Sequence, residues 1–167
     1  MNVKLINIGY YQEAIERLEQ IKKKNYGNSD IKVTNLHLRK LNSLLKRNVF
    51  FKNDAFISAE TLYDIMCEES GRNKHNYHSL STEDVYKGLR YLSEPICIVS
   101  DGPDRYSMIS SFLSSFNIPI LVVVDIKASL VADREAEINK IVTMFPRDDV
   151  EDYIVKHIAS NTLLYKK

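Results

Sequence analysis

Two histidines lie three residues apart in a polar stretch of the chain, Gly71 to Leu89, which reads GRNKHNYHSLSTEDVYKGL. His75 and His78 have Asn, Lys, Tyr and Ser as neighbours, so packing alone does not explain two imidazole rings there. Imidazole suits acid–base catalysis because its ordinary pKa is about 6.5, and it also binds zinc, copper and iron. A third and a fourth ligand are not clearly placed, so we expect no metal and no cofactor. The stretch leaves two interpretations open: acid–base chemistry, or histidines on the surface or at the cap of the next helix.

The other candidates for chemistry are single side chains within expected helices and strands. His157 lies at the edge of an apolar stripe, and His37 lies in a basic segment, so a packed and a solvated histidine are the simpler interpretations. Thr143 is a hydroxyl on a strand that is otherwise apolar or lysine-bearing, and threonine is common in strands. The sequence has no GxGxxG, Walker P-loop, GxSxG or HExxH motif. These residues alone therefore specify no reaction.

The elements that must position these residues change in character after Glu94-Pro95. Helical spacing of apolar residues predicts helices over residues 10–24, 35–48, 56–70, 81–92 and 147–161. Ser58 can cap the third of these, and Ser81 with Asp84 forms the capping-box pattern of the fourth. Runs rich in β-branched and aromatic residues predict strands at 96–100, 105–113, 119–126, 138–145 and 162–165. Strict alternation would place four side chains of the fourth strand on the same face of the sheet: Asn139, Ile141, Thr143 and Phe145.

This order of elements predicts the fold class. Helices come first, and strands follow with connections of hairpin length, which is typical of an α+β protein with an antiparallel sheet. We expect N-terminal helices followed by a small antiparallel β-sheet of four to five strands with a C-terminal helix. The expected division is a helical N-terminal arm over residues 1–53, with a basic second helix, and an α+β domain over residues 54–167.

Length and composition set further bounds. With 167 residues, of which 44% are hydrophobic, the chain can form one ordinary core. It has no apolar run long enough to cross a membrane and no signal-peptide pattern, so we expect a cytoplasmic protein without a membrane partner. Cys67 and Cys97 form no CxxC motif and are interpreted as small buried residues in a reducing compartment.

Charge is distributed unevenly, although the formal net charge is only +1. Residues 35–52 contain five basic residues and no acidic one, whereas residues 53–104 contain ten acidic and four basic ones. A basic surface attracts a phosphate backbone, and complementary charged patches also steer protein partners together. The candidate contacts are Arg39, Lys40, Lys46 and Arg47.

Several short motifs resemble the phage-associated nuclease domains of the Barnase, EndoU, Colicin and RelE-like (BECR) superfamily, which often form the C-terminal domains of phage MuF-type proteins. They extend from about Ala55 to Lys167 and include KHNYHSLSTEDVYKGLRYLSEPICIVSD, PILVVVDI, INKIVTMFP, DYIVKHI and NTLLYKK. The shared features are a lysine–histidine pair before a helix, a Pro-Ile strand that ends in Ser, a strand with Asn and a hydroxyl residue, and a terminal helix followed by LLY.

The resemblance implies metal-independent cleavage of RNA, in which the ribose 2'-hydroxyl attacks the adjacent phosphate. It implies that His75 is the acid or base, with His78 as the alternative, and that Thr143 donates a hydrogen bond to a phosphate oxygen. Weaker candidates for substrate contact are Lys74, Ser100, Tyr153 and Tyr165.

Two functions remain open from the sequence. One is a phage- or toxin-related RNase-like domain with RNA as its partner. The other is a non-catalytic protein-binding module, such as an immunity protein, an antitoxin or a phage-encoded inhibitor, that acts through its charged patches.

Overall fold

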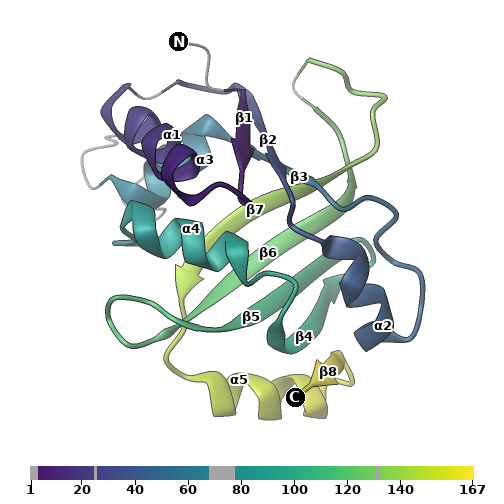
Figure 1. The fold of residues 1–167 in the computed structure, drawn as a ribbon. Coiled ribbons are helices and arrows are strands. Elements are labelled where there is room, and N and C mark those ends of the chain that lie inside the picture. Colours follow the sequence, from purple (N-terminus) through teal and green to yellow (C-terminus); the bar gives the residue numbers. More distant parts are fainter. Residues whose placement is uncertain (1–3, 25, 68–77, 131) are drawn as a thin grey trace.

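A computed structural model describes residues 4–24, 26–67, 78–130 and 132–167 (Figure 1). The strands are β1 (Leu5–Asn7), β2 (Asp30–Thr34), β3 (Ala55–Ser58), β4 (Pro95–Gly102), β5 (Arg105–Leu113), β6 (Pro119–Ala128), β7 (Ile138–Pro146) and β8 (Leu163–Lys166). The helices are α1 (Tyr11–Lys24), the 3₁₀ helix η1 (Leu38–Lys40), α2 (Leu41–Leu45), α3 (Ala59–Met66), α4 (Thr82–Arg90) and α5 (Val150–Ala159).

One mixed sheet joins all eight strands in the order β1-β2-β3-β7-β6-β5-β4-β8. The class is α+β, but the expected small antiparallel sheet of four to five strands is wrong. β1 and β2 are parallel neighbours connected through α1, and β3 is parallel to β7, whereas the other pairs are antiparallel. The additional strands are short and pair with partners distant in sequence, so local periodicity indicates them weakly.

The first 53 residues therefore contain strands as well as helices. In β2, Ile31 and Val33 are buried and alternate with more exposed neighbours, as in a strand that is buried on one face. β2 pairs with β3 in antiparallel register, with Ile31 opposite Ile57. The boundary expected between residues 53 and 54 thus runs between two strands that are hydrogen-bonded neighbours.

The expected basic helix over residues 35–48 is also much shorter in the structure. Only η1 and α2 form, and residues with left-handed backbone flank them: His37 at φ 56° and Lys46 at φ 56°. Such residues cannot continue a right-handed helix, so the basic segment is a compact loop with two short helical turns.

Helices cover the sheet unequally on its two faces. The larger core contains the buried side chains of α1, α3 and α4 and of the segment around α2. A smaller core on the other face lies beneath α5, and β6 shows the alternation, since Val122 and Val124 belong to the larger core and Leu121 and Val123 to the smaller one. Within the described ranges, no helix is long and apolar enough to cross a lipid bilayer.

The helix ends follow the local sequence. Ser81 and Asp84 form the expected capping box of α4, with the Asp84 amide donating to Ser81 Oγ at 3.0 Å and the Ser81 amide donating to Asp84 Oδ2 at 3.2 Å. Ser58 caps α3 by accepting a hydrogen bond from the Thr61 amide at 3.0 Å. Cys97 is buried, and Cys67 is half-buried at the end of α3, where its thiol donates to the Lys22 carbonyl at 3.5 Å.

Candidate functional site

A pocket of about 390 Å³ lies between α3 and the edge of β7. β3 pairs with β7 at a single register position, Phe56 opposite Lys140, and then turns into α3 at Ser58. Beyond Lys140 the edge of β7 therefore faces α3 instead of another strand. The pocket is lined by Thr61, Asp64 and Ile65 of α3, by His78, and by Val142, Thr143 and Phe145 of β7.

A β-bulge in β7 sets the direction of the side chains at this pocket. The register with β6 steps from Ile141 opposite Val124 to Thr143 opposite Val123, which leaves Val142 as the extra residue. An extra residue interrupts the two-residue alternation of a strand and re-aims the side chains that follow. The expectation that Asn139, Ile141, Thr143 and Phe145 share one face is therefore wrong: Ile141 packs in the larger core, whereas Phe145 packs against the smaller one.

The pocket brings together two of the expected catalytic residues, His78 and Thr143. Although they are 65 residues apart in the sequence, His78 Nε2 lies 3.5 Å from Thr143 Oγ1. This separation is at the outer limit of a hydrogen bond, and either atom can donate, depending on the histidine tautomer.

Several contacts hold His78 in place. Its amide donates to the Ile65 carbonyl of α3 at 3.3 Å, and its ring lies 5.4 Å, centre to centre, from the Phe145 ring. The next residue, Ser79, has a left-handed backbone with φ 58°, which is uncommon for serine and is found where the surrounding structure demands it. The strained residue beside His78 indicates that the position of this side chain is set by its surroundings.

Partial burial also sets the protonation state of His78. Desolvation lowers its pKa below the ordinary value of about 6.5, because the charged ring loses solvation. The imidazole is therefore neutral at pH 7 and has one ring nitrogen free to accept a proton.

Two further pocket residues were not among the candidates from the sequence. Asp64 is buried, with an exposed fraction of 6%, although it carries a carboxylate, and Thr61 adds a half-buried hydroxyl. Asp64 lies between the buried residues Leu62 and Ile65 on the same helix. In the sequence, the sign of this pocket residue was an acidic side chain on the otherwise apolar side of a short helix.

Two of the expected residues, His75 and Lys74, lie outside the described residues. Three others are described but do not line the pocket. Ser100 lies on β4, where its hydroxyl donates to the Gly102 carbonyl at 3.0 Å, and Tyr165 of β8 packs against the larger core. Tyr153 is buried in the smaller core beneath α5.

Tyr153 belongs to a packed cluster on α5. The Arg147 guanidinium lies 4.2 Å from the centre of its ring, and the His157 ring lies 4.4 Å away. Burial, with a contribution from the Asp101 charge, raises the pKa of Tyr153 to about 12. His157 shares a hydrogen bond of 2.7 Å with Thr162 Oγ1, which agrees with its interpretation as a packed histidine.

The four basic candidates lie on a different part of the surface from the pocket. Arg39 and Lys40 are on η1, and Lys46 and Arg47 follow α2 directly. All four side chains are exposed, and none lines the pocket of His78 and Thr143. In Figure 1, α2 and α3 lie on opposite sides of the molecule.

No family model, no curated protein and no solved structure matches this chain.

Proposed function

We propose that this protein is a phage- or toxin-related RNase-like domain that cleaves RNA without a metal ion at the pocket of His78 and Thr143. The observation that carries the proposal is the approach of these two side chains to 3.5 Å in a pocket large enough for part of a nucleotide. The BECR-like motifs of the sequence support the same pair, with His78 instead of His75 beside the strand hydroxyl.

The neutral imidazole of His78 acts as the general base. It takes the proton of a ribose 2'-hydroxyl, and the oxygen then attacks the adjacent phosphorus. The bond between phosphorus and the 2'-oxygen forms while the bond to the 5'-oxygen breaks. The products are a 2',3'-cyclic phosphate and a 5'-hydroxyl, and the proton held by His78 can return to the leaving 5'-oxygen.

Thr143 and Asp64 have supporting roles in this scheme. The Thr143 hydroxyl donates to a non-bridging phosphate oxygen, whose negative charge increases in the transition state. The buried Asp64 carboxylate lines the same pocket and can accept a hydrogen bond from a ribose hydroxyl.

The test is incubation of the purified chain with total RNA and tRNA in excess EDTA. The wild-type protein should produce fragments that end in cyclic phosphate, His78→Ala should abolish them, and Thr143→Val should slow cleavage about 10²- to 10³-fold. His37→Asn is the matched control, because His37 is exposed and asparagine tolerates its left-handed backbone. Intact RNA with folded wild-type protein, or full activity in His78→Ala, would refute the proposal.

A second candidate function is a protein-binding module without catalysis. The observation that favours it is the group of exposed basic residues Arg39, Lys40, Lys46 and Arg47, for which the described residues supply no ion pair. Binding of a partner protein should then survive His78→Ala and weaken when these charges are reversed, as measured by pull-down with a purified acidic partner.

A further inference from the structure

Residues 38–53 form a closed and internally bonded loop, here called the 38–53 loop. Its ends meet where the Leu38 amide donates to the Asn53 carbonyl at 3.3 Å and the Arg39 amide donates to Asn53 Oδ1 at 3.3 Å. In its interior, the Asn42 side chain donates to the Phe50 carbonyl at 2.8 Å and accepts from the amides of Val49 and Phe50 at 2.9 and 2.8 Å. Compact surface loops with adjoining ends are frequently functional.

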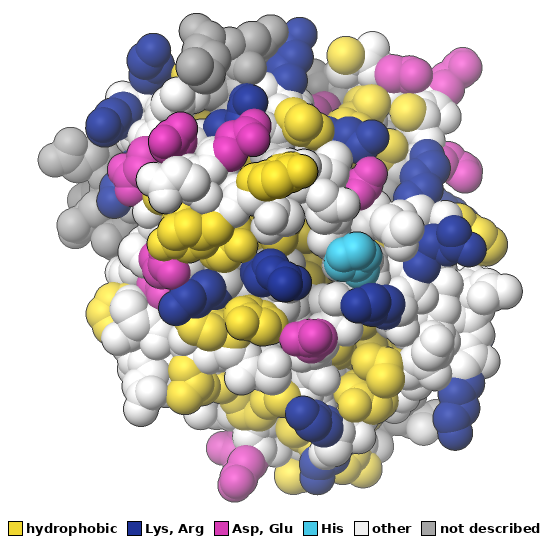
Figure 2. Space-filling view, viewed as in Figure 1, with side chains coloured by type: hydrophobic (Ala, Val, Ile, Leu, Met, Phe, Trp, Pro, Cys, Tyr) yellow, Lys and Arg dark blue, Asp and Glu magenta, His cyan; other side chains and the backbone are white. Residues whose placement is uncertain are grey.

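The loop separates its apolar side chains sharply from its charged ones. Leu38, Leu41, Val49 and Phe50 are buried in the larger core. The outward side of the loop presents Arg39, Lys40, Lys46 and Arg47 together with Phe51, whose exposed fraction is 76%. Figure 2 shows Lys and Arg side chains over the part of this face where α2 lies.

The four cations on this outward side lack ion-pair partners among the described residues. Within the same residues, the one hydrogen bond of their side chains is that of Arg47 Nη2, which donates to the Tyr106 hydroxyl at 3.5 Å. Cations without carboxylate partners are available to an anion, and an exposed phenyl ring remains in water. A ligand that is anionic and has a flat apolar part would match both features.

Two hollows that residues of the loop line have the matching chemistry. The first, of about 370 Å³, is lined by Asn42, Ser43, Lys46, Arg47 and Asn48. Hydroxyl, amide and cationic donors of this kind suit a phosphate. The second, of about 180 Å³, is mainly apolar and is lined by Val49, Phe51, Lys52, Ile126, Lys127, Glu137, Ile138 and Asn139. Consecutive residues, Asn48 and Val49, line the first and the second hollow, respectively.

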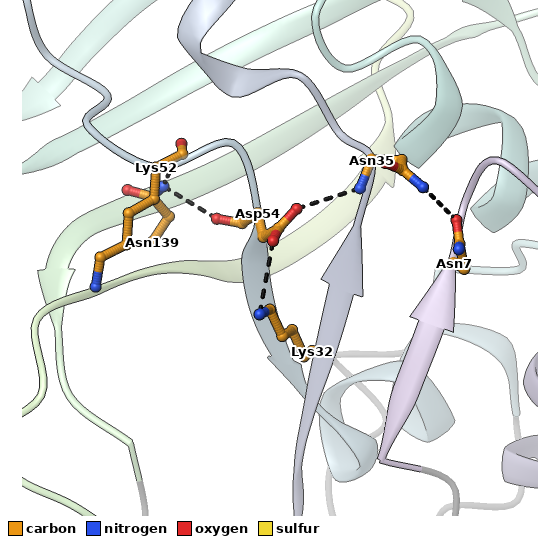
Figure 3. A network of polar contacts seen from close by, with 6 residues as sticks. All are labelled: Asn7, Lys32, Asn35, Lys52, Asp54 and Asn139. Carbon is orange, nitrogen blue, oxygen red and sulfur yellow. Dashed lines mark hydrogen bonds and ion pairs between the residues drawn. The ribbon is translucent and has the colours of Figure 1, made fainter.

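The loop is also attached to the strand that carries Thr143. Asn139 Nδ2 of β7 donates to the carbonyls of Lys52 and Asp54 at 3.2 and 3.1 Å, as Figure 3 shows, and Lys52 Nζ donates to the Glu137 carbonyl at 2.7 Å. From Asn139 to Thr143 the strand advances by about 13 Å, at roughly 3.3 Å per residue. The loop and the pocket are therefore positioned relative to each other by one strand.

We propose that the 38–53 loop binds single-stranded RNA, with its cations on the phosphates and an unpaired base stacked on Phe51. The identity of the ligand rests on the proposed RNase function. Sequence-tolerant binding of single strands typically combines a basic surface with exposed aromatic rings. RNA fits the loop better than an acidic protein does, because its phosphates match the donor-lined hollow and its flat bases match the exposed ring of Phe51 on the same loop.

The test measures binding in the His78→Ala background, so that the RNA stays intact. Fluorescence anisotropy with a labelled, unstructured RNA of about twelve nucleotides gives the dissociation constant at two salt concentrations. Phe51→Ala should raise this constant about tenfold, since stacking of one base is worth roughly that factor or more. Lys40→Glu combined with Lys46→Glu should raise it at least tenfold and make binding less sensitive to salt.

Matched controls exist on the same chain. Phe116 is another exposed phenylalanine, with an exposed fraction of 56%, and Lys23 and Lys24 are exposed cations at the end of α1. Phe116→Ala and the pair Lys23→Glu with Lys24→Glu should leave the dissociation constant within about twofold, and thermal melting should show that every variant is folded.

The outcomes separate this inference from the proposed function. Equal losses in the loop and control variants, or no loss in the loop variants, would overturn the RNA-binding loop even if the wild-type protein cleaves RNA. Absence of RNA binding would overturn it in favour of an acidic protein partner. RNA that is bound through the loop but never cleaved by the wild-type protein would refute the RNase proposal alone.

Discussion

Asp84 provides the sharpest test of how the loop that carries His78 is anchored. Its carboxylate is 2% exposed and accepts three hydrogen bonds: from the Ser81 amide at 3.2 Å, the Ser115 amide at 2.8 Å and the Ser115 hydroxyl at 2.8 Å. One side chain thus fixes the N-cap of α4, Ser81, which follows His78 by three residues, to the turn between β5 and β6. Asp84→Ala removes all three acceptor contacts at once.

The size of the effect follows from these contacts. A hydrogen bond to an ionised group contributes about 1.5–3 kcal/mol, so three bonds at the lower value give about 4.5 kcal/mol. Ser115 is exposed and Ser81 is half-buried, so water can replace part of the loss. We expect the free energy of unfolding to fall by about 3 kcal/mol, which corresponds to a decrease in Tm of about 6–12 °C for a chain of this length.

Urea and thermal unfolding, followed by circular dichroism, measure this effect. Asp84→Asn retains one acceptor oxygen and should lose about half as much stability. Asp152→Ala is the control, because Asp152 is an exposed acidic residue in the first turn of α5, where its interaction with the helix dipole is worth about 0.3–1 kcal/mol. If Asp84→Ala cost no more than Asp152→Ala, the carboxylate would not be the anchor described above.

Two further predictions concern charged groups. Burial lowers the pKa of His78 in the folded protein, so as the pH falls below about 6.5 this histidine becomes protonated in the unfolded chain before it does in the folded one. The free energy of unfolding should therefore decrease as the pH falls from about 6.5 to the lower pKa of the folded state. His78→Gln should remove this slope in urea titrations, and a slope that persists in the variant would assign it to other groups. Arg105 contacts both oxygens of Asp125 at 2.6 and 2.9 Å, but the arginine side chain is 45% exposed. A double-mutant cycle with alanine should therefore give a coupling of only about 0.2–1 kcal/mol that decreases with salt, and a coupling above about 2 kcal/mol would contradict this reasoning.

The sequence by itself determined the elements that depend on local signals. The apolar spacing over residues 10–24 and the serine caps at Ser58 and Ser81 correspond to α1, α3 and α4 as they fold. The β-branched runs after Pro95 form β4 to β7, and the short closing run forms the edge strand β8. Caps and periodicity act within one or two turns of the chain, so neighbouring residues contain the necessary information.

Only the tertiary structure decided how these elements join. β1 and β2 are short and complete a sheet whose other strands lie far along the chain, and the run over residues 35–48 becomes a closed loop because residues such as Asn42 bond to the segment after it. The Val142 bulge, which directs Thr143 to the pocket, depends on register with β6. The approach of His78 to Thr143 requires α3 to lie along the free edge of β7. These features are set by pairing and packing between residues that are distant in the sequence, and local sequence patterns carry no information about such contacts.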